Sequence, residues 1–127
     1  MIVVVDGNDG TGKSTLVELL RRRGFTVKDR GAPTYMTDHK DGHAALGEVY
    51  VILDAPVHVS RKRLRAAGKA LDERYHTTKD LEHYRERFKE VAAELPHSAL
   101  INAQGAPETV LERALTALAR LGVVAPE

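Results

Sequence analysis

Residues 2–15 read IVVVDGNDGTGKST, and this stretch decides the fold. An apolar run over 2–5 is followed by a glycine-rich segment of the form G-x-x-x-x-G-K-S and then by apolar residues at helical spacing: Leu16, Val17 and Leu20. Strand, glycine-rich loop and helix N-terminus in this order predict a loop that binds the phosphates of a nucleoside triphosphate. A turn that only links strand to helix is the alternative, and the agreement of all three parts favours the phosphate loop.

The residue types of the loop suit a triphosphate that carries Mg²⁺. Glycine takes positive φ values and lets backbone N–H groups approach phosphate oxygens without a Cβ clash. Lys13 is spaced to reach the β- and γ-phosphates, and the Ser14 hydroxyl to ligate Mg²⁺. The residues predicted to hold the nucleotide are those of the loop: Asp9, Gly10, Thr11, Gly12, Lys13, Ser14 and Thr15.

Length and composition predict one soluble domain spanning 1–127. The formal net charge of +1 gives no global basic excess of the kind that marks nucleic-acid-binding proteins. The sequence has no cysteine, which excludes disulfides and suits a cytoplasmic protein. We expect no signal peptide, and no run of the sequence is long enough to span a membrane. The oligomeric state, a homodimer included, stays open.

Alternating apolar segments predict a three-layer α/β fold in which a short parallel sheet of about four strands is flanked by helices. We expect strands over 2–5, 25–28, 49–53 and 99–101, and helices over 13–23, 57–67, 80–95 and 107–121, with Asp80 as the N-cap of the third helix. Ligands of such sheets bind beyond the carboxyl ends of the strands. That rule brings the phosphate loop, Asp29, Arg30, Asp54 and the loop after Ile101 to one rim.

Asp29 and Arg30 follow the second predicted strand at this rim. A carboxylate there can serve as the Mg²⁺-water partner of Ser14 or as a general base on an acceptor hydroxyl. An adjacent arginine can bind an anionic acceptor. We predict catalytic roles for both; a surface ion pair that closes the turn before Gly31 is the alternative.

Cationic residues crowd the segment 61–69, and Arg74 follows it. Arginines that close over the moving phosphoryl group stabilise its negative charge. On a helix Arg61 and Arg65 share a face, while Arg63 points elsewhere. We predict that one or two of Arg61, Arg65 and Arg74 contact phosphates and that the rest lie on the surface, against the alternative of a solvated basic face.

Other polar and aromatic residues give weaker signals. Four loop residues suit a solvated turn better than a metal site: Asp38, His39, Asp41 and His43. Four histidines are predicted on the surface or in packing roles: His58, His76, His83 and His97. Three side chains are candidates for the wall of an acceptor-base pocket: Tyr35, Met36 and Tyr75. Tyr84 and Phe88 are expected in the core.

Together these residues resemble the thymidylate kinase family of nucleoside monophosphate kinases, in two blocks. The first block, 5–16, is similar to that family's phosphate loop, with Asp9 before the second glycine. The second joins the strand over 50–56 to an arginine-bearing helix and a lid over about 68–79. The pair Asp29-Arg30 is similar to the family's Asp-Arg pair at the end of a core strand. The resemblance implies a kinase that uses ATP and Mg²⁺.

The resemblance also implies roles for single residues. Lys13, Ser14 and Thr15 would hold ATP and Mg²⁺, and Asp9 would approach the sugar of the acceptor. Arg30 would contact the acceptor's phosphate or its reacting oxygen. The lid would carry Arg61, Arg65 and Arg74, and the backbone from Asn102 to Ala106 would surround adenine.

The chain is much shorter than members of that family. Most of the difference falls between the first helix and Asp29, and the acceptor region over 29–47 is reduced as well. The acceptor is left open between a free deoxynucleoside monophosphate, thymidylate-like, and a hydroxymethylated pyrimidine within DNA, as in phage base modification. A P-loop nucleotide-binding protein without turnover is the other class. The lid arginines and Asp29 argue against it, because a protein that only binds needs neither.

Overall fold

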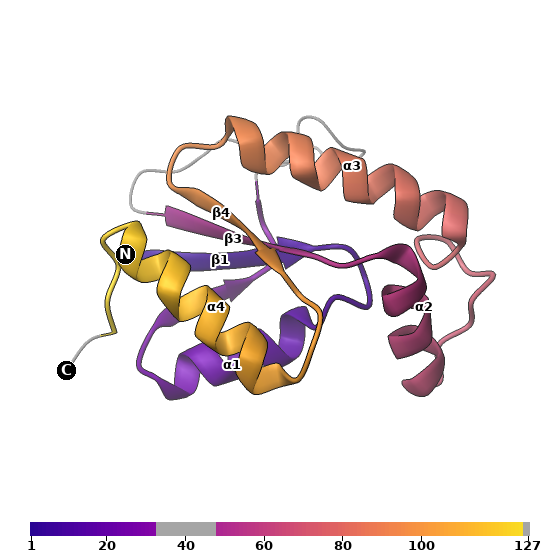
Figure 1. The fold of residues 1–127 in the computed structure, drawn as a ribbon, viewed down its shortest axis with the longest axis horizontal. Helices are drawn as coiled ribbons and strands as arrows, with labels where there is room; N and C mark the ends of the chain where they lie inside the picture. The colour runs from indigo at the N-terminus through magenta and orange to yellow at the C-terminus, as the bar shows by residue number, and fades with distance from the viewer. Residues whose placement is uncertain (33–47, 126–127) are drawn as a thin grey trace.

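The computed structural model describes residues 1–32 and 48–125. Eight elements follow one another along the chain (Figure 1): β1 Ile2–Gly7, α1 Lys13–Arg22, β2 Thr26–Asp29, β3 Glu48–Asp54, α2 Val57–Ala66, α3 Thr78–Glu94, β4 Ser98–Asn102 and α4 Pro107–Arg120. Each strand and helix expected from the sequence is confirmed, with ends shifted by one or two residues. The candidates in the segment 33–47, which are Tyr35, Met36 and the polar turn with Asp38, His39, Asp41 and His43, lie outside the described residues.

The four strands form one parallel sheet in the order β2-β1-β3-β4. The central strand β1 is paired on both sides, with Val5 opposite Asp29 of β2 and opposite Val51 of β3. The apolar run in β3 is continuous because helices cover both faces of the sheet. The predicted α/β fold with a short parallel sheet is therefore confirmed.

Helices lie on both faces of the sheet, and alternate residues of each strand point to opposite layers. Val3 and Val5 pack in the cluster that contains α1 and α4, whereas Val4 packs with α3 in a second cluster. Figure 1 shows α3 on one side of the strands and α1 with α4 on the other, with α2 beyond the carboxyl ends of the strands. This arrangement leaves the rim beyond β1 and β3 between α1, α2 and α3.

The start of α3 differs from the expectation. Its N-cap is Thr77, whose hydroxyl accepts a hydrogen bond from the Asp80 N–H at 3.1 Å. Asp80, predicted as the cap, lies in the first turn, and its carboxylate accepts from the Tyr75 N–H at 2.9 Å. The predicted apolar face is confirmed, since all five residues are buried: Leu81, Tyr84, Phe88, Val91 and Leu95.

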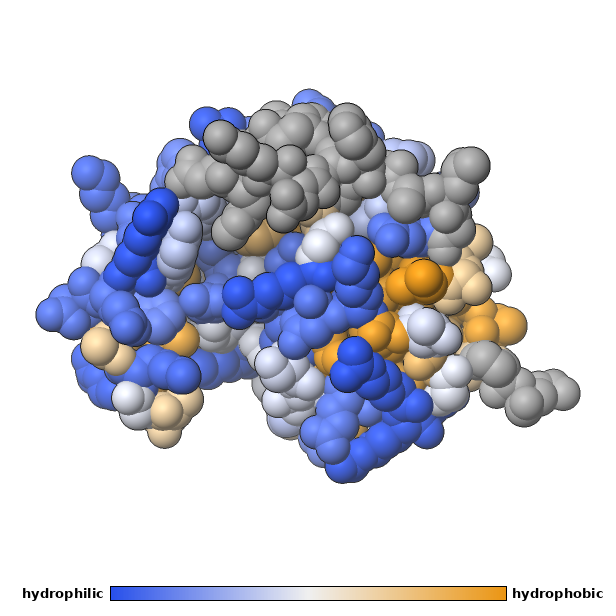
Figure 2. Space-filling view, turned by 180° about the vertical axis from the view of Figure 1, so that it is seen from behind, coloured by the Kyte–Doolittle hydropathy of each residue, from blue (hydrophilic) through white to orange (hydrophobic). Residues whose placement is uncertain are grey.

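The surface seen from behind is mainly hydrophilic (Figure 2). Hydrophobic colour gathers beside the chain ends, where Met1, Ile2 and Val124 are exposed. Among residues 1–32 and 48–125, no helix combines the length and the apolar character needed to cross a membrane.

Candidate active site at the glycine-rich loop

The loop between β1 and α1 has a backbone that glycine makes accessible. Gly7, Gly10 and Gly12 have φ values of 140°, 80° and 92°. At Gly7 an added Cβ would lie 2.5 Å from the Leu53 carbonyl oxygen, and at Gly10 it would lie 2.5 Å from that of Ser60. The loop is therefore pressed against the end of β3 and against α2, which fixes its shape.

We expect Gly10→Ala to destabilise the fold by about 2–4 kcal/mol, because a left-handed φ and a backbone clash act together. Gly122→Ala is the matched control: its φ is 80°, but an added Cβ there would meet no atom within 4 Å. The control should cost only about 1–2 kcal/mol. Urea unfolding of both variants measures the difference, and equal losses would show that α2 does not press on the loop.

Lys13 lies inside the loop and is only 6% exposed. Its ammonium donates hydrogen bonds to the carbonyl oxygens of Gly7 at 2.9 Å and Asn8 at 2.7 Å, and lies 3.6 Å from the Asp9 carboxylate. Burial lowers the pKa of Lys13, and the negative charge of Asp9 acts against that shift. A cation is thus held at the centre of the loop by oxygen atoms alone.

A cavity of about 580 Å³, here called the loop cavity, opens beside the loop. Figure 2 shows the hollow from behind, between the part of the molecule that carries α2 and the part that carries α1. Its polar end is formed by residues 9–15, and the exposed Ser14 and Thr15 lie there. Its other end is formed by Ala103, Gly105, Pro107 and Val110. The volume is that of a typical ligand site.

Arg63 joins the two ends of the loop cavity. Its guanidinium donates to the Thr11 carbonyl oxygen at 3.3 Å and to that of Ala103 at 2.7 Å. The buried residues of α2 are Ser60 and Leu64. Arg63 follows Ser60 by about one helical turn and directly precedes Leu64. The face of α2 that packs inward therefore brings Arg63 to the loop.

The three arginines predicted from the sequence lie elsewhere. Arg61 and Arg65 line a separate cavity between α2 and α3, where Arg61 donates to the Thr78 hydroxyl at 2.7 Å. Arg74 lies over the ring of Tyr75, 4.9 Å from its centroid. The structure thus brings Arg63, rather than Arg61, Arg65 or Arg74, to the wall of the loop cavity.

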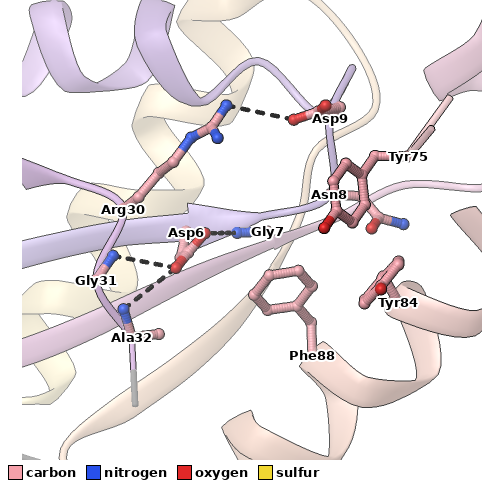
Figure 3. Close-up of a pocket in the computed structure, with 10 residues that line it drawn as sticks. All are labelled: Asp6, Gly7, Asn8, Asp9, Arg30, Gly31, Ala32, Tyr75, Tyr84 and Phe88. Atoms are coloured by element: carbon pink, nitrogen blue, oxygen red, sulfur yellow. Dashed lines mark hydrogen bonds and ion pairs between the residues drawn. The ribbon is translucent and has the colours of Figure 1, made fainter. Parts of the chain in front are cut away.

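A second cavity, of about 340 Å³, lies on the α3 side of the sheet rim and is here called the aromatic cavity. Figure 3 shows three rings, those of Tyr75, Tyr84 and Phe88, on one side of it and Asp6 and Arg30 on the other. The sequence made Tyr75 a candidate for the wall of a pocket, and in the structure it lines this cavity. Tyr84 and Phe88 are buried as expected, and they also border this cavity.

The chain that leaves β2 is tied to the end of β1, and this places Arg30. The Arg30 N–H donates to the Val5 carbonyl oxygen at 2.8 Å, and Arg30 takes a left-handed φ of 68°. The buried Asp6 carboxylate accepts hydrogen bonds from the N–H groups of Gly31 at 3.2 Å and Ala32 at 3.1 Å. Asp29 is exposed and is not among the residues that line either cavity.

Asp9 lies where the two cavities meet. Asp9 and Arg30 line both of them, and one Asp9 carboxylate oxygen lies 3.3 Å from the Arg30 guanidinium. The other carboxylate oxygen lies 3.1 Å from Nε2 of His76. With Lys13 at 3.6 Å, three basic side chains surround this carboxylate. Sequence reasoning placed His76 on the surface or in a packing role, and no local pattern links it to a residue so far away in the chain.

Two further polar residues of the rim, Asp54 and Asn102, accept hydrogen bonds from other residues of the protein. Asp54 accepts hydrogen bonds from Arg85 at 2.8 and 3.1 Å. Asn102 accepts from the Gln104 N–H at 3.0 Å and does not line the loop cavity. Within the described residues, no group of three His, Asp or Glu side chains could hold a metal by itself. A Mg²⁺ ion at Ser14 would take most of its ligands from phosphate and water, as Mg²⁺ commonly does.

The fold is an α/β fold with a short parallel sheet flanked by helices, in which a glycine-rich loop leads from the first strand into the first helix. No protein-family model matches the chain, and no curated protein matches its sequence. Among solved structures, its fold is similar to the unliganded crystal structure of a sugar kinase from Janibacter sp. HTCC2649. The TM-score is 0.64 over 99% of this chain and 98% of that one, at 16% sequence identity. At this identity the likeness concerns the fold.

Proposed function

We propose that this protein is a Mg²⁺- and ATP-dependent phosphotransferase that moves the γ-phosphoryl group to a nucleotide-type acceptor. The observation that carries the proposal is the junction of two cavities at Asp9 and Arg30. A phosphate cradle opens on one side of this junction and an aromatic wall on the other. A group transferred from the first ligand to the second would pass these two side chains. The likeness of the fold to a sugar kinase agrees with the class of reaction.

The loop cavity suits ATP. Glycine residues free the loop backbone to bind phosphates, and Lys13 supplies a cation beside them. Beyond Arg63 the cavity is lined by Ala103, Pro107 and Val110, whose apolar surfaces suit a purine ring. A nucleoside triphosphate lying along the cavity would direct its terminal phosphate to Asp9 and Arg30. Mg²⁺ would neutralise phosphate charge there, with Ser14 as its protein ligand.

The aromatic cavity suits a planar base with an anionic group. Rings such as Tyr75 and Phe88 stack with nucleobases irrespective of sequence. The guanidinium of Arg30, 66% exposed, lies between this cavity and the loop cavity and can bind a phosphate. We therefore propose a free nucleoside monophosphate as acceptor, with its base against the rings and its phosphate at Arg30. A hydroxymethylated base within DNA is the second candidate, since its hydroxyl could take the place of that phosphate.

Three side chains divide the work of transfer. Lys13 and Arg30 stabilise the negative charge that spreads over the moving phosphoryl group. Asp9 orients both cations and can accept a proton from an acceptor that reacts through a hydroxyl. A phosphate acceptor needs no such base, because its oxygens are largely ionised at neutral pH. The demand for a base therefore differs between the two candidate acceptors.

Transfer of radiolabelled γ-phosphate from ATP tests the proposal. The acceptors are the free deoxynucleoside monophosphates and single- and double-stranded DNA, with normal or hydroxymethylated pyrimidines. Labelling of a free monophosphate is expected, and labelling of modified DNA alone would select the second candidate. ATP binding without transfer to any member of the panel would contradict the proposal and favour a P-loop protein that only binds nucleotides.

Tyr75→Ala is expected to raise the KM of the acceptor about tenfold, because it removes one stacking surface from the aromatic cavity. The Kd of ATP should stay unchanged, since Tyr75 does not line the loop cavity. Tyr75→Phe keeps the ring and is the matched control. Steady-state kinetics with both substrates checks this prediction; a larger effect on ATP than on the acceptor would contradict the assignment of the two cavities.

A further inference from the structure

His76 is held between acceptors of hydrogen bonds on both sides of its ring. Nδ1 lies 2.9 Å from the Ala70 carbonyl oxygen and 3.3 Å from the Glu73 carboxylate. Nε2 lies 3.1 Å from the Asp9 carboxylate. A carbonyl or carboxylate oxygen can only accept, so hydrogen bonds at both ring nitrogens require two N–H groups, which only the imidazolium carries.

Charged groups surround the contact between His76 and Asp9. The Asp9 carboxylate also lies 3.6 Å from the Lys13 ammonium and 3.3 Å from the Arg30 guanidinium. Glu73, on the same segment as His76, adds a second negative charge beside the ring. Lys13 and Arg30 thus lie beside Asp9, the partner of His76. The two charged groups nearest to the ring, Asp9 and Glu73, are both carboxylates.

The segment between α2 and α3 connects the contact of His76 with Asp9 to both cavities. Tyr75 takes a left-handed φ of 72°, and its N–H is held by Asp80 at the start of α3. Tyr75 lines the aromatic cavity, whereas His76, the next residue, lines the loop cavity. One turn of chain thus forms part of both walls, and Asp9 is the residue of the loop to which it is attached.

We infer that His76 is a positioning residue that acts as an imidazolium: it fastens the segment 69–77 to Asp9 and so holds the Asp9 carboxylate between the two cavities. The inference rests on the proposed function for its effect on transfer. Without a donor at this position the Asp9 carboxylate loses its tie to the segment, and the transfer rate should fall.

Three variants and two readouts test the inference. His76→Gln should lower kcat about tenfold, as expected for loss of a charged hydrogen bond. His76→Lys keeps a cation and should restore the rate. His58→Gln, an exposed histidine on α2, is the matched control and should behave as the wild type. Melting curves show that each variant is folded.

Nitrogen NMR of the histidine rings decides the charge independently of activity. Both ring nitrogens of His76 should carry a proton, and amide exchange over 69–77 should accelerate in His76→Gln. A His76 ring with a single N–H, or a His76→Gln variant with the rate of the wild type, overturns the inference. If no variant transfers phosphate at any pH, the proposed function fails, and the NMR result still settles whether the charged contact exists.

Discussion

Lys13→Ala is expected to lower the rate of phosphoryl transfer about a thousandfold, because removal of a group that stabilises transition-state charge has effects of this size. In the structure the ammonium donates to the carbonyl oxygens of Gly7 and Asn8, at the centre of the loop. It is therefore already inside the loop that would bind the phosphates. Transfer assays at saturating ATP and acceptor measure the loss, and activity above about a tenth of wild type would contradict the role of the loop.

Loss of the two hydrogen bonds of Lys13 could also change the loop itself, so that the variant needs controls. Lys13→Met keeps a side chain of similar length and removes the ammonium with its charge and its hydrogen bonds, and it should lose as much activity as Lys13→Ala. Lys89→Ala removes the same group from α3, where Lys89 lies 3.5 Å from Glu86 and far from the loop in sequence. It should leave transfer unchanged. Unfolding curves for all three variants separate a lost charge from a lost fold.

The sheet and its helices are predictable from local patterns. The apolar run in β3, Glu48–Asp54, predicts a strand covered on both faces, and the structure buries it between two clusters. The glycine-rich loop predicts the first strand–loop–helix unit, because its spacing requires that context. The face of α3 is also predictable, since its buried residues repeat at helical spacing. Its N-cap is less so, because Thr77 and Asp80 are both suitable capping residues.

The site depends on which way the strands and helices direct their side chains, and this is harder to predict from the sequence than the elements themselves. Asp29 follows Val27 by two residues, so strand alternation directs it to the α1 side, whereas the aromatic cavity opens on the α3 side. Arg63 could have been found, because Ser60 and Leu64 mark the inward face of α2 and Arg63 adjoins it. His76 could not, since its contact with Asp9 depends on the left-handed turn at Tyr75 and on a pairing between distant segments.

Asp9→Asn is expected to lower kcat about a hundredfold, within the range that positioned acid–base groups contribute. Asparagine keeps the shape of the side chain but loses the charge that holds Arg30 and His76 at 3.3 and 3.1 Å. The Kd of ATP should not rise, because Lys13 loses a competing anion near the phosphates. A fall in kcat without weaker ATP binding therefore marks a residue that acts at the junction of the cavities.

Asp29→Asn provides the comparison that identifies which carboxylate serves the reaction. Asp29 is exposed and lines neither cavity, so we expect Asp9→Asn to cost more than Asp29→Asn. The larger loss at Asp29 would mean that this residue reaches the acceptor when ligands bind, and that Asp9 only positions cations. The size of the loss also depends on the acceptor. A hydroxyl acceptor requires the base, so Asp9→Asn should cost more with a hydroxymethylated base than with a monophosphate, whose oxygens are largely ionised.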